Sequence, residues 1–172
     1  CYCCRKAYRV GHPFYDQMCV ACGDFNYAKR SPEADLRGRV AIVTGARVKI
    51  GFQAAIMLLR SGCTVHVMTR FPRDAARRYA REEDFSEWSE RVHIHGIDLR
   101  HTPSVEALCQ HLLETLPRLD FLINNACQTV RRPPGFYNHL LAHETCDIAA
   151  LPAEEVKLLS LGREHTLSLI HI

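Results

Sequence analysis

The sequence predicts an α/β protein built on part of a doubly wound parallel sheet, preceded by a small cysteine-rich segment. Short apolar runs alternate with amphipathic helical patterns from residue 39 to residue 123, which is typical of strands joined by crossover helices. A glycine turn follows the first apolar run, and two Cys-x-x-Cys pairs lie near the start of the chain. The 172 residues suffice for one domain and a small appendage, and the formal charge of +3 gives no reason to expect nucleic acid as the main partner.

Each strand is predicted from an apolar run and each helix from apolar residues at helical spacing. Near-continuous apolar strands are typical of a parallel sheet that is covered on both faces. We expect strands at 40–43, Thr64–Thr69, Val92–Gly96 and Leu119–Ile123, and helices at Ile50–Ser61, from Pro72 to about Arg81, from Thr102 to about Leu116, up to His143 and from Pro152 to Leu161. The side chains expected to face the sheet are Ile50, Ala54, Met57, Leu58 and Phe52 in the first of these helices, and Val105, Leu108, Leu112, Leu113 and Leu116 in the third.

The stretch Arg39–Gly51, RVAIVTGARVKIG, is the most informative one in the chain. A buried strand, a glycine turn and a helix N-terminus turn free backbone N–H groups toward a phosphate. The stretch resembles the TGxxxGxG cofactor motif of the short-chain dehydrogenase/reductase family, with Lys49 in place of the middle glycine. The resemblance implies a Rossmann domain, here incomplete, over residues 39–166. The cofactor-binding residues that it implies in the turn are Gly45, Arg47, Lys49, Ile50 and Gly51. Lys49 either reaches a phosphate or points to solvent.

Two further motifs fall where the family resemblance requires them. Asn124-Asn125-Ala126 ends the last predicted strand and resembles the family's NNAG motif, with Cys127 replacing glycine. In the family these residues tie the fourth strand to its neighbours and bring backbone against the cofactor ribose, which implies roles for Asn125 and Ala126. Asp98-Leu99 resembles the acidic position after the third strand, whose carboxylate accepts from the adenine amino group.

Arg70 indicates which dinucleotide is bound. It follows the second predicted strand directly, where a carboxylate would hold the ribose 2′-hydroxyl and an arginine would accept a 2′-phosphate. Residues 68–71 contain no acidic side chain, so the sequence favours NADP(H) over NAD(H). Arg47 and Arg73 are candidates for the same phosphate site, because a guanidinium fork suits phosphate. The alternative for Arg70 is a solvated loop residue.

No catalytic residue can be assigned. The family uses a tyrosine acid, a lysine four residues later and an upstream serine. The only Tyr-x-x-x-Lys is Tyr2–Lys6, upstream of the cofactor motif, while Tyr137 is followed by Leu141 and no tyrosine follows Ser160 or Ser168. We therefore expect an N-terminal fragment of an NADP(H)-dependent oxidoreductase that acts on a small-molecule carbonyl or alcohol. The alternative is a non-catalytic dinucleotide-binding regulatory or adaptor protein that docks a protein partner through the cysteine-rich segment.

The cysteine-rich segment, residues 1–30, predicts a structural zinc knuckle. Two Cys-x-x-Cys turns can complete a tetrahedral site, and a segment this short needs metal to supply its folding energy. The predicted zinc ligands are Cys1, Cys4, Cys19 and Cys22, with Cys3 and His12 as alternative ligands. Gly23 is expected to let the backbone curl around the metal. The other interpretation is a set of redox-labile thiols in a disordered tail.

The remaining expectations concern the linker, the tail and the compartment. Residues 31–38 form a polar linker, and Leu167–Ile172, LSLIHI, resembles a translated sequencing adapter, so we expect a non-native tail at 167–172. The chain begins at Cys1 rather than Met, which predicts that the true N-terminus is missing. No apolar run is long enough to span a membrane, and a dinucleotide fold with scattered cysteines favours a reducing, cytoplasmic location.

Overall fold

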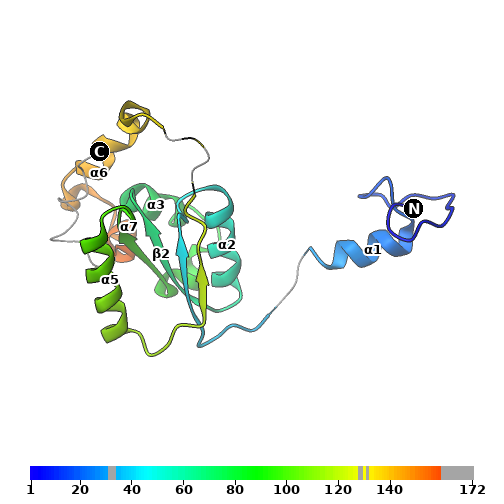
Figure 1. Ribbon diagram of the computed structural model, residues 1–172, viewed down its shortest axis with the longest axis horizontal. Coiled ribbons are helices and arrows are strands. Elements are labelled where there is room, and N and C mark those ends of the chain that lie inside the picture. Colours follow the sequence, from blue (N-terminus) through cyan, green and yellow to red (C-terminus); the bar gives the residue numbers. More distant parts are fainter. Residues whose placement is uncertain (31–33, 128–129, 131, 160–172) are drawn as a thin grey trace. The chain divides into compact units, whose positions relative to one another are not determined.

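The computed structural model describes residues 1–30, 34–127, 130 and 132–159, and divides the chain into two compact units, Cys1–Ala34 and Asp35–Ile172 (Figure 1). The predicted tail Leu167–Ile172 lies outside the described residues, as do Ser160 and Ser168. Among the described residues, no helix combines the length and the apolar character that a membrane crossing requires.

The second unit is built on a four-stranded parallel sheet, as predicted. Its strands are β1 (Val40–Thr44), β2 (Thr64–Thr69), β3 (Val92–Gly96) and β4 (Phe121–Ile123), in the order β3-β2-β1-β4. The chain adds β2 and β3 on one side of β1 and then crosses to add β4 on the other side. The direction of winding therefore reverses between β1 and β4, the place where open α/β sheets bind ligands.

Strand β4 begins two residues later than predicted, and Asp120 joins its start to β1 through both backbone and side chain: its backbone N–H donates to the Val40 carbonyl oxygen at 2.9 Å. Its carboxylate accepts from the backbone N–H of Val40 at 2.9 Å and from the guanidinium groups of Arg39 and Arg118. The pairing with β1 starts only at Phe121, which lies opposite Ala41.

Helices cover both faces of the sheet, and each cover has its own core. Helices α2 (Lys49–Arg60) and α3 (Pro72–Tyr79) pack on one face, with α4 (Phe85–Trp88) and the 3₁₀ turn η1 (Ser89–Arg91) leading into β3. Helix α5 (Thr102–Thr115) lies on the opposite face from α2 (Figure 1). The larger core includes Val43, Val65, Val67, Ile56, Leu59, Tyr79 and Trp88. The smaller core, under α5, consists of Ile42, Met68, Ile97 and Leu112. Alternate strand residues supply the two cores, as a doubly covered sheet requires.

The face of α2 that meets the sheet differs in part from the prediction: Phe52 is buried and Leu58 packs against the larger core as expected. Ile50 and Met57 were expected to face the sheet but are 79% and 53% exposed. The buried side is formed by Gly51, Phe52, Ala55, Ile56 and Leu59. The close packing of Gly51 against the end of β4 fixes the rotation of the helix, and positions four and eight residues later then face the core. Leu113 in α5 was likewise expected inside and is 78% exposed.

The segment after the sheet returns to α3 and to the edge of β3. It comprises η2 (Pro134–Tyr137), α6 (Asn138–Thr145), η3 (Ile148–Ala150) and α7 (Ala153–Leu158). Helices α6 and α7 both contact α3, Leu158 is fully buried in the larger core, and Leu159 forms a parallel bridge with Ile94 of β3. The two helices predicted here are therefore present; the part of the second one beyond Leu159 lies outside the described residues.

Candidate functional site

A pocket of about 590 Å³ opens at the carboxyl ends of the strands. The turns that follow all four strands contribute to it, so it lies at the reversal point of the sheet. Its lining consists of Gly45, Arg47, Val48, Lys49, Ile50, Met68, Thr69, Arg70, Phe71, Ile97, Asp98, Leu99, Arg100, Asn125, Ala126, Cys127 and Tyr137. All the predicted cofactor residues except Gly51 and Arg73 line it.

Thr44 and Asn125 join the glycine turn to the end of β4. The Thr44 hydroxyl oxygen accepts from the backbone N–H groups of Asn125 and Ala126, both at 3.0 Å. In return the Asn125 side-chain amide donates to the carbonyl oxygens of Thr44 at 3.1 Å and Gly45 at 3.2 Å. The Asn125 side-chain amide therefore joins the end of β4 to the glycine turn.

Both motif glycines are required by close approaches. A β-carbon on Gly45 would lie 2.9 Å from the α-carbon of Ala126, and Gly45 has a φ of +65°. Gly51 lies behind the pocket, where a β-carbon would be 2.4 Å from the Asn125 side-chain nitrogen and 2.7 Å from the Gly45 carbonyl oxygen. The turn and the strand end therefore fit together only with glycine at these two positions.

Lys49, which replaces the middle glycine of the motif, has a backbone conformation that favours glycine. Its φ is +57°, so the backbone keeps the left-handed conformation that suits a glycine at this position. A lysine in this conformation costs roughly 1–2 kcal/mol. Its exposed side chain lines the pocket beside Ile50.

Arg70 and Arg47 both lie over the ring of Phe71. The guanidinium carbon of Arg70 is 5.4 Å from the Phe71 ring centroid and 5.0 Å from that of Tyr137. The guanidinium carbon of Arg47 is 5.3 Å from the Phe71 centroid, and its Nη1 contacts Asp74 at 2.6 Å. Two cations are therefore held beside one aromatic ring at the end of β2.

Arg73 does not join them, contrary to the prediction. It is 7% exposed, donates to the carbonyl oxygens of His143 and Cys146, and is not among the pocket residues. The reason is that Pro72 starts α3 directly after Phe71, and the second residue of this helix is turned toward α6 rather than the pocket.

Asp74 organises the arginines on this side of the pocket. Its fully buried carboxylate accepts from Arg47 at 2.6 Å, Arg77 at 2.6 Å and Arg78 at 2.7 Å. Burial alone would raise the pKa of Asp74, but the hydrogen bonds from the three guanidinium groups hold it well below its usual range. Nothing in the sequence marks Asp74 as a buried carboxylate.

Asp98 and Leu99 lie in the wall formed by the turn after β3. The hydrogen bond from the Arg100 side chain lowers the pKa of Asp98, which is therefore ionised at neutral pH. Its carboxylate also accepts from the backbone N–H of Arg100 at 3.0 Å. Leu99 is 45% exposed and adds an apolar surface beside this charge.

The four predicted metal ligands come together in the first unit. The sulfur atoms of Cys1, Cys4, Cys19 and Cys22 all lie within 4.8 Å of one another, and those of Cys4 and Cys19 are 4.0 Å apart. Zinc–sulfur bonds of about 2.3 Å in a tetrahedron separate the sulfurs by roughly 3.8 Å, so the cluster needs little contraction to hold an ion. Hydrogen bonds with Cys19 and Cys4 raise the pKa of Cys22 to about 11, because one crowded thiol disfavours ionisation of the next.

Two expectations about this unit are wrong. His12 is no alternative ligand: its Nδ1 accepts from the backbone N–H groups of Phe14 and Tyr15, and its Nε2 faces Asp24 at 3.4 Å. Gly23 lies inside helix α1 (Val20–Ala28), where a β-carbon would be 2.2 Å from the His12 ring. It is therefore needed for helix-to-histidine packing and not for a turn around metal.

Two further residues singled out in this unit are Cys3 and Tyr2. Cys3 is outside the four-cysteine cluster, with its Sγ 3.8 Å from the Met18 sulfur. Tyr2 of the Tyr-x-x-x-Lys pair is 63% exposed in the cysteine unit.

Comparison with known proteins gives the following relationships. The sequence model of the family described as "short chain dehydrogenase" matches residues 39–148. An uncharacterized protein of Acanthamoeba polyphaga mimivirus is 35% identical over 135 residues, covering 76% of this chain and 29% of the relative. Dehydrogenase/reductase SDR family member 13 of Bos taurus is 35% identical over 116 residues (63% and 30%), and retinol dehydrogenase 11 of Mus musculus is 33% identical over 151 residues (79% and 47%). The chain thus spans less than half the length of these relatives.

Solved structures are similar to about two thirds of this chain. A metagenomic short-chain oxidoreductase in complex with NADP has 28% sequence identity and a TM-score of 0.48, covering 64% of this chain and 52% of that one. A short-chain dehydrogenase from Escherichia coli CFT073 complexed with NADPH has 24% identity and a TM-score of 0.49, covering 66% and 50%.

Proposed function

The chain belongs to the short-chain dehydrogenase family, and on that premise we propose that it is the cofactor-binding part of an NADP(H)-dependent oxidoreductase. The whole protein would act on a small-molecule carbonyl or alcohol. The observation that carries this proposal is Arg70, which follows β2, lines the pocket and has no carboxylate beside it in residues 68–71. A 2′-phosphate is the part of a dinucleotide that a guanidinium at this place would recognise.

The other pocket residues support a consistent binding mode. The turn from Gly45 to Gly51 ends at the N-terminus of α2, where backbone N–H groups and the helix dipole favour the diphosphate. Asp98 and Leu99 suit the adenine, since an ionised carboxylate accepts from its amino group and an apolar side chain packs on its ring. The backbone of Asn125 and Ala126 would face the ribose. Bound NADPH would supply the hydride.

Arg47 can share the 2′-phosphate although it already contacts Asp74. Three arginines surround that one carboxylate, so the group carries an excess of positive charge. Arg47 keeps a partly exposed side chain on the pocket wall, and a guanidinium has five N–H donors. Lys49 adds a cation on the turn itself.

For the first unit we propose a structural zinc ion held by Cys1, Cys4, Cys19 and Cys22. Four thiolates would fill a tetrahedral site and leave no open position for water, which favours a structural over a catalytic ion. The ion would stabilise the ionised thiols that otherwise disfavour one another.

Exchange of one side chain tests the cofactor assignment. Arg70→Asp should raise the dissociation constant of NADPH roughly 10- to 100-fold, because a charged hydrogen-bonding partner is lost and a like charge is introduced, and should leave NADH binding unchanged or tighter. Arg81→Asp is the matched control, since Arg81 is exposed and outside the pocket. Unchanged relative affinities in Arg70→Asp would refute the assignment.

A second candidate is a non-catalytic dinucleotide-binding adaptor that docks a protein through the cysteine unit. It is favoured by the exposed aromatic side chains of that unit, Phe14, Phe25 and Tyr27, which are 54%, 64% and 52% exposed. The coding sequence downstream of this chain discriminates between the two candidates. A serine followed by Tyr-x-x-x-Lys supports the oxidoreductase, whereas a complete reading frame without them supports the adaptor.

A further inference from the structure

Tyr137 reaches the pocket from outside the strand-end turns that form the rest of its wall. It ends the short turn η2, is 7% exposed, and its ring centroid is 5.0 Å from that of Phe71. With Phe71 and Leu140 it forms a small separate core at the pocket wall. The arginine that carries the cofactor assignment, Arg70, lies over both aromatic rings.

A guanidinium that contacts two aromatic rings can still bind a phosphate. A guanidinium attracts aromatic rings through its flat face, while its N–H donors point outward in the plane of the group. An arginine held in this way has fewer rotamers to lose when a phosphate arrives, so less of the interaction energy is spent on ordering the side chain. Phe71 alone would contact Arg70 only as its neighbour in sequence, whereas Tyr137 provides a second ring from a different part of the chain.

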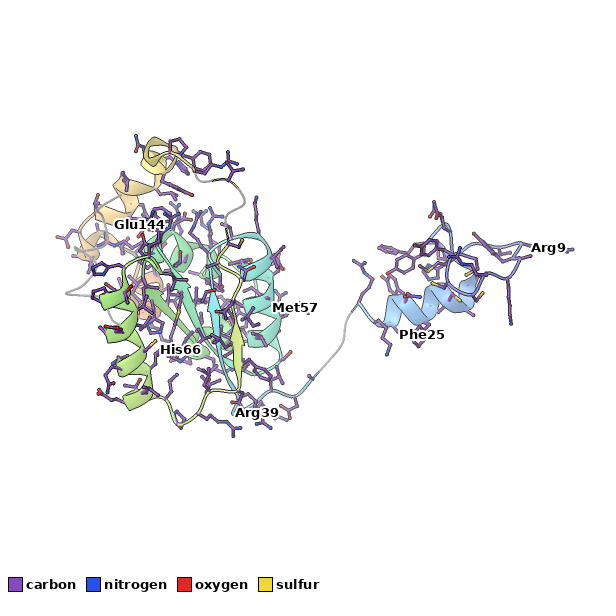
Figure 2. The ribbon with its side chains drawn as sticks, in the orientation of Figure 1. Arg9, Phe25, Arg39, Met57, His66 and Glu144 are labelled. Carbon is purple, nitrogen blue, oxygen red and sulfur yellow. The ribbon has the colours of Figure 1, made fainter. Side chains whose placement is uncertain are left out.

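The segment that carries Tyr137 is fixed to the same side of the pocket by buried hydrogen bonds. The Glu144 carboxylate, 4% exposed, accepts from the backbone N–H groups of Arg73 at 3.1 Å and Asp74 at 2.8 Å. These N–H groups have no partner within α3, because they belong to its first turn, two and three residues after Phe71. Figure 2 labels Glu144 where α6 approaches α3. The side chain of Arg73 completes the attachment by donating to carbonyl oxygens of His143 and Cys146.

We propose that Tyr137 is a positioning residue that sets the preference for NADPH by holding Arg70 in its phosphate-binding orientation. The inference rests on the proposed function of the pocket. Part of the preference for NADPH over NADH would then come from the aromatic ring of Tyr137. The segment that carries this ring is attached to α3 through Glu144.

Two substitutions in the intact chain separate the aromatic face from the bulk of the side chain. Tyr137→Phe keeps the ring, and Tyr137→Leu keeps an apolar side chain in the small core but removes the ring. Dissociation constants of NADPH and NADH are measured for each variant by fluorescence titration. We expect the leucine variant to lose roughly three- to tenfold in NADPH affinity with NADH unchanged, and the phenylalanine variant to keep the wild-type ratio within about twofold.

The ratio of the two affinities is the informative readout, because general damage to the pocket would weaken both cofactors together. If the leucine variant does not fold, Tyr137→Met, which is also non-aromatic and more adaptable, takes its place. An unchanged ratio in the non-aromatic variant overturns the inference while leaving the cofactor assignment intact. Loss of the preference for NADPH over NADH in the phenylalanine variant also overturns the inference, since the Tyr137 hydroxyl rather than its ring would then be responsible. If the wild-type chain shows no preference for NADPH, the proposed function itself fails.

Discussion

Gly51 lies so close to Asn125 that a β-carbon on the glycine would be 2.4 Å from the asparagine side-chain nitrogen. The two residues belong to motifs far apart in the sequence, one at the start of α2 and one after β4. Their contact sets the rotation of α2 and holds the end of β4 against the glycine turn. The shape of the cofactor pocket and the packing of α2 on the sheet therefore both depend on the contact between Gly51 and Asn125.

Gly51→Ala is expected to destabilise the protein by about 1–3 kcal/mol, the usual cost of forcing atoms into a filled space. The Asn125 amide would have to leave the carbonyl oxygens of Thr44 and Gly45, and NADPH binding should weaken as well. Urea denaturation measures the first effect. Gly135→Ala is the control, because among the described residues the nearest atom to a β-carbon there is the Asn138 side-chain nitrogen, at 3.8 Å, and the stability should change little. Equal effects at the two positions would contradict this account of Gly51.

Lys49 offers a test of backbone strain. With φ at +57°, Lys49→Gly should relieve up to about 1 kcal/mol, after allowance for the greater freedom of glycine in the unfolded chain. Lys49→Val should destabilise the protein, because a β-branched residue tolerates positive φ least. The free energy of unfolding measured by urea should therefore rank glycine above lysine above valine.

The same change inside the helix should have the opposite sign. Gln53 is exposed within α2, and Gln53→Gly is expected to cost roughly 1 kcal/mol there. A loss of similar size in Lys49→Gly would mean that position 49 is not strained.

The sequence was sufficient to predict the strands, their parallel arrangement and most of the pocket, because these depend on local patterns. Apolar runs mark β1 to β3, and each motif after a strand is brought to the same edge once the strands are parallel. Strand β4 is shorter than its apolar run, and no apolar pattern reveals that the Asp120 carboxylate accepts from the backbone N–H of Val40 at its start.

What the sequence did not predict depends on contacts between distant residues. The predicted face of α2 was wrong for Ile50 and Met57, because these residues fit a helical apolar pattern as well as the buried Phe52 and Ile56 do, and the close approach of Gly51 to Asn125 is not visible in that pattern. Arg73 has the same residue type as Arg70, but the start of α3 turns it toward α6. The place of Tyr137 in the pocket wall was not predicted, because the sequence shows there only a tyrosine that lacks the lysine four residues later.

A buried histidine pair predicts how stability depends on pH. His66, labelled in Figure 2, has its Nδ1 2.9 Å from the Nε2 of His95, with His93 stacked on His66 and His111 of α5 nearby. Burial, followed by the charges of neighbouring histidines, lowers the pKa of His66 to about 4 and that of His95 to about 3. Their pKa values in the unfolded chain are about 6.5.

Because the unfolded chain takes up these protons first, stability should fall as the pH drops below about 6.5, by up to roughly 1.4 kcal/mol per pH unit for each histidine. The loss should level off once the pH is below the folded-state pKa values. Urea denaturation at pH 7 and pH 5 measures it. The double variant His66→Leu with His95→Leu should show a flatter dependence between these values; an equal slope would mean that other groups cause the loss.

The cysteine cluster predicts one zinc ion per chain. Metal analysis of the intact purified protein should find it, and a chelator should reduce the helical signal of α1 because the unit has little core of its own. Cys19→Ser should lower the zinc content, whereas Cys109→Ser should not, since Cys109 is an exposed thiol in α5. An intact chain without zinc would remove the proposal.

Titration of the intact chain with NADPH and with NADH shows whether the pocket at the strand ends selects a phosphorylated dinucleotide. Arg70, supported by Arg47 and Phe71, predicts that NADPH binds at least about tenfold more tightly, a difference of roughly 1.4 kcal/mol. Equal or tighter binding of NADH, or no binding of either dinucleotide, would contradict the account.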